Sequence, residues 1–223
     1  MIADRGPAEP PELAAHIAGT PLTAPEQKAL RREVLTLAWP SIVENFLQTM
    51  VGVVDTALER WDFLDPERLG IIGGSYGGFL TSWTIGHTPR FKAAVSERAV
   101  NHHVSAFGSS DIYWVFERQF GGPMWEHVEE WLRMSPALYA ADIETPVLVL
   151  HSENDLRCNI EQGEHLFMLL RLLGKEVEMV RFPAEGHELS RAGSPVHRVQ
   201  RFEAILEWFG RYLSPVGPGG SAG

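Results

Sequence analysis

Cysteine is nearly absent from the sequence, which contains only Cys158 among 223 residues. One thiol cannot form a disulfide within the chain, so the fold does not depend on an oxidising compartment. The first residues, MIADRGPAEPPELAAH, also lack the basic stretch followed by an apolar stretch that a secretory signal needs. The sequence therefore predicts a cytoplasmic protein and does not support secretion.

Positive charge is also scarce, because 19 Lys and Arg residues against 29 Asp and Glu residues give a formal net charge of -10. Affinity for nucleic acid comes mainly from Lys and Arg side chains that neutralise phosphates, and no basic stripe is present. Nucleic acid is therefore not expected as a partner. The 44% hydrophobic and 22% charged residues are typical of a folded protein, and the length favours a single domain.

A long uninterrupted apolar run is missing as well. The best candidate for a membrane span, Val34 to Leu58, has sufficient length to cross a bilayer. It is interrupted by Pro40, Glu44, Asn45, Gln48 and Asp55. Each charge at the centre of a membrane helix costs about 2.5–3.5 kcal/mol on insertion scales. Membrane insertion is therefore disfavoured, although a protein anchored by this segment remains a third hypothesis.

The chain divides into three parts. Residues 1–25 contain five prolines and predict an irregular arm, and from Pro25 to about Arg60 apolar residues recur at helical spacing with a break at Pro40. We assign 1–56 to the arm and this helical segment, 57–213 to a catalytic core and 214–223 to a disordered tail.

Within the core, short apolar runs alternate with longer amphipathic segments, which is typical of an α/β fold with a mostly parallel sheet. We expect strands at residues 68–73, 92–98, 145–153 and 177–183. We expect helices at residues 77–86, 111–134, 161–173 and 195–212.

Four glycines surround Ser75 in the sequence GGSYGG, directly after the first expected strand. Gly73, Ser75 and Gly77 match G-x-S-x-G, in which a serine occupies a sharp turn between a strand and a helix. The positions on either side must then lack side chains so that strand and helix can approach closely. The alternative is a glycine-rich phosphate loop, which predicts a following lysine of the GK[ST] kind, and none follows. Ser75 is the predicted nucleophile.

A serine nucleophile needs a base and an acid, and both follow later strands in the order Ser, Asp, His. Asp155 follows the apolar run PVLVLH, and His187 follows VEMVRF. Loops at the carboxyl ends of parallel strands converge on one site, so these side chains are expected to meet Ser75. The competing acids are Glu153, which lies earlier in the same loop, and Asp142, which precedes its strand.

Other residues with chemical potential have simpler interpretations. His102 and His103 suggest a metal, but no third ligand at a sensible spacing accompanies them, so neither metal nor cofactor is expected. His151 is interpreted as structural, and Cys158 as a small packing residue. Several aromatic residues favour the core over a substrate pocket: Trp83, Trp114, Trp125, Trp131, Phe107, Phe116 and Phe120.

The sequence resembles the catalytic domain of the prolyl oligopeptidase family, particularly its acylaminoacyl-peptidase branch. The matching stretches are DPERLGIIGGSYGGFLTSW, RFKAAVSERAV, SPALYAADIETPVLVLHSENDLRCNIEQGEHLF and FPAEGHELSRAGSPVHRVQR, within residues 54–213. The resemblance implies an α/β-hydrolase with Ser75 as nucleophile, Asp155 as orienting acid and His187 as general base. It also implies that the backbone N–H of Tyr76 supplies one oxyanion donor.

The residues before Ser75 depart from this family pattern. The family implies several strands before the nucleophile strand, with a loop that gives the second oxyanion donor, whereas here the preceding residues predict helix and tail. Residues 30–57 instead resemble the first helix of a multidrug and toxin extrusion transporter. We therefore expect a chimera-like chain with a truncated hydrolase core, whose first strand, as an exposed sheet edge, favours a homo-oligomer.

These features predict a serine hydrolase that cleaves short acyl esters through a Ser-His-Asp triad and an acyl-enzyme. Loss of one oxyanion donor costs about 10²–10³ in rate, which favours reactive esters over amides. The alternatives are a serine peptidase of acylaminoacyl or dipeptidyl type acting on short peptides, and a truncated remnant without catalysis.

Overall fold

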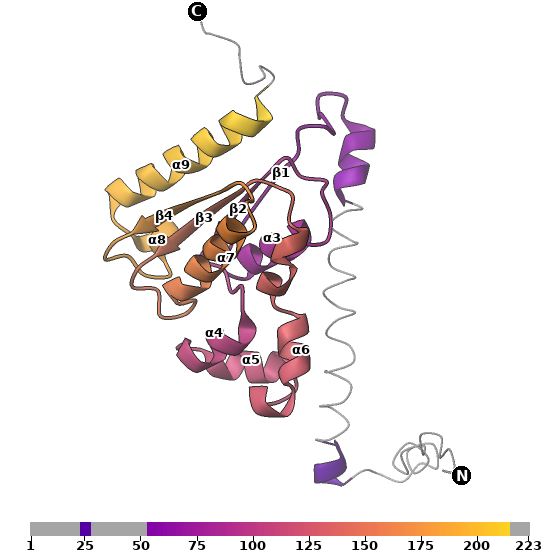
Figure 1. Ribbon diagram of the computed structural model, residues 1–223, viewed down its shortest axis with the longest axis vertical. Helices are drawn as coiled ribbons and strands as arrows, with labels where there is room; N and C mark the ends of the chain where they lie inside the picture. The colour runs from indigo at the N-terminus through magenta and orange to yellow at the C-terminus, as the bar shows by residue number, and fades with distance from the viewer. Residues whose placement is uncertain (1–22, 28–52, 215–223) are drawn as a thin grey trace, which may run out of the picture.

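The computed structural model describes residues 23–27 and 53–214. Four parallel strands form one sheet in the order β1-β2-β3-β4 (Figure 1). Their bounds are β1 (Gly70–Gly74), β2 (Ala93–Glu97), β3 (Val147–Ser152) and β4 (Val177–Phe182). Parallel neighbours need a crossover connection, and helical segments supply it after β1, β2 and β3. The expected parallel α/β fold is confirmed, and each predicted strand overlaps the observed one.

Helical segments occupy most of the remaining chain. Residues 24–27 and 53–60 are helical, and the others are α3 (Tyr76–Ile85), α4 (His103–Ser109), α5 (Tyr113–Gln119), η1 (Met124–Glu126), α6 (Val128–Arg133), η2 (Pro136–Asp142), α7 (Ile160–Leu172), α8 (Leu189–Ala192) and α9 (Pro195–Leu213). The region 111–134, predicted as helical, is divided into α5, η1 and α6. Gly121 has a φ of 75° and Pro123 cannot donate a backbone hydrogen bond, so a continuous helix is interrupted there.

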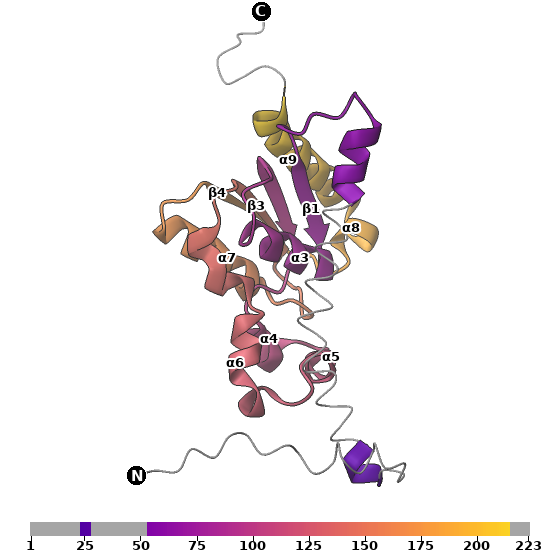
Figure 2. The same cartoon turned by 90° about the vertical axis from the view of Figure 1, so that its right-hand side faces the viewer.

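The two faces of the sheet are covered by different helices. Alternate residues of β2 and β3 point to opposite faces. On one face Ala94, Val147 and Val149 pack with α3 and α7, while on the other Val95 and Leu148 pack with α9. Figures 1 and 2 show α9 on one side of the sheet, with α3 and α7 on the other. Every residue of β2 and β3 is buried, which explains the apolar runs Ala93–Val95 and Val147–Leu150.

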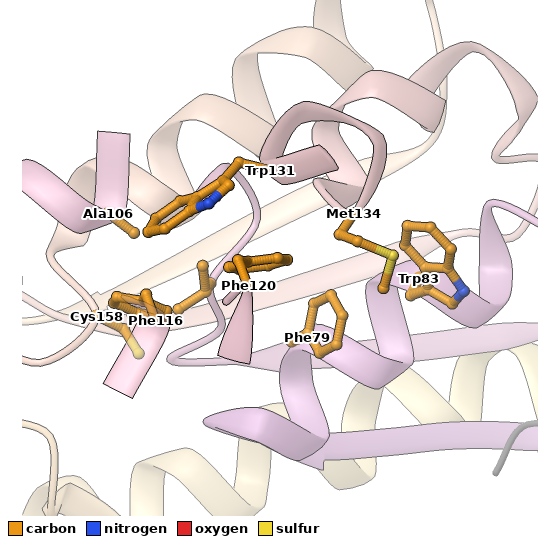
Figure 3. Close-up of a cluster of buried hydrophobic side chains, with 9 residues drawn as sticks. Phe79, Trp83, Ala106, Phe116, Phe120, Trp131, Met134 and Cys158 are labelled. Carbon is orange, nitrogen blue, oxygen red and sulfur yellow. The ribbon is translucent and has the colours of Figure 1, made fainter. Parts of the chain in front are cut away.

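A second core cluster joins α3 to the group formed by α4, α5 and α6. The buried residues are Phe79, Trp83, Val100, Ala106, Phe116, Phe120, Trp131, Met134 and Cys158. Figure 3 shows Phe120 between Trp131 and Phe79. Of the seven aromatic residues predicted to belong to the core, four are buried in this cluster and Phe107 packs against it, whereas Trp114 and Trp125 are 45% and 69% exposed.

Most of the segment that resembles a transporter helix lies outside the described residues, as do residues 1–22 of the proline-rich arm and nearly all of the predicted tail. The described end of the arm enters a helical stretch at residues 24–27, where irregular structure was predicted. The described helix at residues 53–60 is tied to the core by an ion pair between Asp55 and Arg90. Among the residues that the structure describes, no helix has both the length and the apolar character to cross a membrane.

Candidate active site

Ser75 lies on a tight turn that joins β1 to α3. Its φ of 61° and ψ of -121° place a non-glycine residue in a region that such residues rarely adopt. The Ser75 N–H donates to the carbonyl of Glu97 at 2.9 Å, and the Ser75 carbonyl accepts from the N–H of Phe79 at 3.0 Å. One bond anchors the turn to β2 and the other begins the helix, so the backbone conformation of Ser75 is fixed from both sides.

Two of the surrounding glycines are required by close backbone contacts. A Cβ on Gly73 would lie 2.1 Å from the carbonyl oxygen of Gly77, and a Cβ on Gly78 would lie 2.6 Å from that of Glu97. A Cβ on Gly77 would meet nothing within 4 Å. The expectation that Gly77 must lack a side chain was therefore wrong on steric grounds, because this position faces away from the strand-helix contact.

His187 and Asp155 meet Ser75 in one hydrogen-bonded line. The Nε2 atom of His187 lies 2.9 Å from Ser75 Oγ, and its Nδ1 atom lies 2.8 Å from Asp155 Oδ2. A carboxylate accepts, so Nδ1 carries the proton and Nε2 is left to accept the proton of the serine hydroxyl. The structure thus brings the three predicted residues together from the loops that follow β1, β3 and β4.

The carboxylate of Asp155 is buried and held by backbone donors. Its Oδ1 atom accepts from the N–H groups of Arg157 and Cys158, each at 2.9 Å, and its side chain is 0% exposed. His151, in β3, lies close by, with Nε2 3.8 Å from Asp155 Oδ2 and 2.7 Å from the carbonyl oxygen of Cys158. Burial lowers the pKa of His151 and raises that of Cys158 to about 12, so both stay neutral near pH 7.

The loop that carries His187 is attached to the core at several points. Leu189 is buried in the cluster beneath α9. Glu185 accepts from Nδ1 of His197 at 2.7 Å and from the backbone N–H of Ser194 at 2.9 Å. The hydrogen bond from His197 lowers the pKa of Glu185, as expected for a carboxylate that accepts such bonds.

The alternative acids lie elsewhere. Glu153 forms an ion pair with Arg181 at 3.1 Å, and Asp142 ends η2 before β3 begins. His102 is the N-cap of α4, where Nδ1 accepts from the N–H of Ser105. In residues 23–27 and 53–214 no group of three or more His, Cys, Asp or Glu side chains is arranged to hold a metal ion.

Tyr76 is the first residue of α3, so its backbone N–H belongs to the helix N-terminus that follows the serine. N–H groups and the helix dipole both favour negative charge at this end of a helix. Partial burial raises the pKa of the Tyr76 hydroxyl to about 12, which keeps the side chain neutral at physiological pH.

Arg98, a buried cation directly after β2, was not predicted from the sequence as a functional residue. Its Nη1 atom donates to Ser190 Oγ at 2.8 Å and lies 3.3 Å from Glu97 Oε1. Arg201, from α9, binds the same carboxylate through two contacts of 2.5 and 2.6 Å. The available signal was the charged pair at the end of KAAVSER, because charged residues that close a buried strand need partners.

The parallel sheet, the covering helices and the serine on the turn after β1 define an α/β-hydrolase fold. Residues 43–215 match the prolyl oligopeptidase family, and the chain belongs to that family. The match begins inside residues 30–57, so part of the segment that resembles a transporter helix also falls within the family match.

The chain is similar to proteins that are named as peptidases or as an acylamino-acid-releasing enzyme. The chain is 48% identical over 165 residues to the uncharacterized peptidase YuxL of Bacillus subtilis (strain 168), covering 74% of this chain and 25% of that protein. It is 34% identical over 168 residues to the acylamino-acid-releasing enzyme of Arabidopsis thaliana, covering 71% and 22%. The solved structure of uncomplexed Pyrococcus horikoshii acylaminoacyl peptidase has a TM-score of 0.73 and 32% identity, covering 78% and 29%. The chain thus spans about a quarter of the length of these curated relatives.

Proposed function

We propose that this chain is a serine peptidase of acylaminoacyl or dipeptidyl type, which acts on short peptides through Ser75, His187 and Asp155. The observation that carries the proposal is the continuous line from Asp155 Oδ2 through the His187 ring to Ser75 Oγ, with contacts of 2.8 and 2.9 Å. A buried acid, an oriented imidazole and a serine on a tight turn are the parts that nucleophilic acyl transfer needs.

In the proposed first step, His187 Nε2 takes the proton of Ser75 and Oγ forms a bond to the substrate carbonyl carbon. The negative charge that develops on the carbonyl oxygen is stabilised by the backbone N–H of Tyr76. His187 then gives its proton to the leaving amine as the carbon-nitrogen bond breaks, which leaves an acyl-enzyme. Water attacks this ester by the same proton route and releases Ser75, while Asp155 stabilises the imidazolium in both halves.

The names of the relatives support peptides over the short acyl esters that the sequence predicted. Both the Arabidopsis thaliana and Pyrococcus horikoshii proteins are named for acylaminoacyl substrates, and the Bacillus subtilis relative is named a peptidase. Short acyl esters remain the second candidate, because Tyr76 is the one oxyanion donor that we assign among the described residues. Esters need less stabilisation of that charge, since an alkoxide or phenoxide leaves more readily than an amine.

A substrate panel tests the proposal. The purified chain is given acetyl-aminoacyl and dipeptidyl p-nitroanilides together with p-nitrophenyl acetate and butyrate, with Ser75→Ala as the control. We expect release of p-nitroaniline by the wild type and none above background by Ser75→Ala. Cleavage of the esters alone would instead assign an esterase, and no turnover of any substrate would favour the remnant without catalysis.

A further inference from the structure

Arg98 lies against the turn that carries the proposed nucleophile and has an unusual backbone conformation. It follows β2 directly, is only 9% exposed and has a φ of 40°, which is uncommon for a residue with a side chain. Its backbone N–H donates to the carbonyl of Leu150 at 2.8 Å, which ties it to β3. Burying a cation and straining its backbone both cost free energy, so the surrounding contacts must determine this position strongly.

The guanidinium of Arg98 lies between the turn that carries Ser75, here called the serine turn, and the segment of residues 183–190 after β4 that carries His187, here called the histidine loop. On one side it lies against the backbone of Gly74, where a Cβ would come within 3.1 Å of Cζ and Nη2. On the other side Nη1 donates to Ser190 Oγ at 2.8 Å, in α8 and three residues after His187. One side chain therefore contacts both of the segments that must stay in register for the serine and histidine to meet.

The strand order explains why a contact between these two segments is needed. The serine turn follows β1 and the histidine loop follows β4, and β2 and β3 lie between them in the sheet. No ladder hydrogen bonds join β1 to β4, so the distance from Ser75 to His187 depends on contacts made beyond the strand ends. The Glu97 carboxylate, which Arg201 holds through two contacts, lies 3.3 Å from Arg98 Nη1 and so helps to fix the position of the guanidinium.

We propose that Arg98 is a positioning residue whose guanidinium holds Ser190, and with it the His187 loop, at the distance required for proton transfer from Ser75. This inference rests on the proposed function. A displacement of about 1 Å in a reacting pair can cost up to about 10²-fold in rate. Because Arg98 acts on the pair rather than on substrate, its loss should lower kcat and leave KM nearly unchanged.

The test uses Ser190→Ala and Arg98→Lys, with Arg191→Ala as the matched control. Ser190→Ala removes the hydrogen bond with little change in volume, and Arg98→Lys keeps the charge but shortens the reach and removes the fork. Arg191 lies next to Ser190 and pairs with Glu188, with a side chain that is 66% exposed. We expect kcat to fall about 10- to 100-fold in the two test variants and to stay at the wild-type value in the control.

Amide hydrogen exchange gives a second readout that does not depend on turnover. Residues 184–193 should exchange faster in Ser190→Ala and Arg98→Lys than in the wild type, and at the wild-type rate in Arg191→Ala. Wild-type kcat together with wild-type exchange in both test variants would overturn the inference. A wild type that shows neither turnover nor reaction of Ser75 with a fluorophosphonate probe would instead refute the proposed function. Hydrogen exchange alone would then show whether Arg98 holds the segment that carries His187.

Discussion

Asp155 and Glu153 lie two residues apart in one loop, yet they have different partners. Asp155 is buried, accepts two backbone N–H groups and contacts His187, whereas Glu153 pairs with Arg181 near the surface. The two carboxylates carry the same charge and differ in their surroundings. The proposed catalytic acid is therefore distinguished by burial and hydrogen bonding, not by charge.

The matched variants Asp155→Asn and Glu153→Gln test this difference. Asp155→Asn replaces an acceptor by an amide that favours the wrong His187 tautomer, so we expect kcat to fall by about 10³- to 10⁴-fold. Glu153→Gln should stay within about twofold of the wild type, because an exposed ion pair contributes little. Steady-state kinetics on one p-nitroanilide measures both, and equal losses would contradict the assignment of the acid.

Gly73 and Gly77 provide a second matched pair at the residue scale. Gly73→Ala places a methyl group 2.1 Å from the carbonyl oxygen of Gly77, so the turn must shift. We expect a loss of about 1–3 kcal/mol or more in the free energy of unfolding, together with loss of activity. Gly77→Ala meets no atom within 4 Å and should be neutral or stabilising by up to about 1 kcal/mol. Urea unfolding monitored by circular dichroism distinguishes the two variants.

At the scale of elements, α4 begins with a buried histidine inside an aromatic cluster. The ring of His103 lies 5.1 Å from that of Phe79 and 5.0 Å from that of Phe120, measured between centroids. Burial and the neighbouring charge of His102 lower the pKa of His103 to about 3, against about 6.5 in an unfolded chain. The neutral imidazole is therefore part of the packing that joins α4 to α3 and α5.

This shift predicts acid sensitivity. Because the folded pKa lies below the unfolded one, the unfolded state binds the extra proton, and stability is complete above about pH 6.5 and falls as the pH drops towards about 3. His103→Phe should reduce the slope of unfolding free energy against pH by up to about 1.4 kcal/mol per pH unit. Phe116→Leu in the same cluster should lower stability equally at pH 7 and pH 5. Urea unfolding at both values measures this, and an unchanged slope in His103→Phe would count against the shift.

The elements differed in how well the sequence predicted them. Buried parallel strands leave unbroken apolar runs, so all four strands and the positions of Ser75, Asp155 and His187 after them could be predicted. Helices α4 and α8 are too short for a helical hydrophobic period to be detected in the sequence. The contact between Arg98 and Ser190 joins residues 92 positions apart, and no local pattern reports such a pair. Local sequence likewise could not show that Gly73 and Gly78, rather than Gly77, are crowded.

At the scale of the whole molecule, β1 is an edge of the described sheet and pairs with β2. Ile72 in this strand is 46% exposed. A flat apolar edge is a template for pairing with another chain, so we expect a dimer or higher oligomer that buries β1. Ile72→Lys should shift the chain towards monomer, whereas Leu172→Lys, at an exposed position of α7, should not. Light scattering at micromolar concentration measures both, and a monomeric wild type would refute the expectation.

The central claim is that Ser75 is activated by His187 and Asp155 within this chain. Reaction with a fluorophosphonate probe, followed by mass spectrometry of the labelled peptide, tests it most directly because the probe needs an activated serine but no particular substrate. We predict one label per chain on Ser75, labelling slower by about 10³-fold or more in His187→Ala, and none in Ser75→Ala. An unlabelled wild type, or equal labelling of Ser75→Ala, would contradict the account.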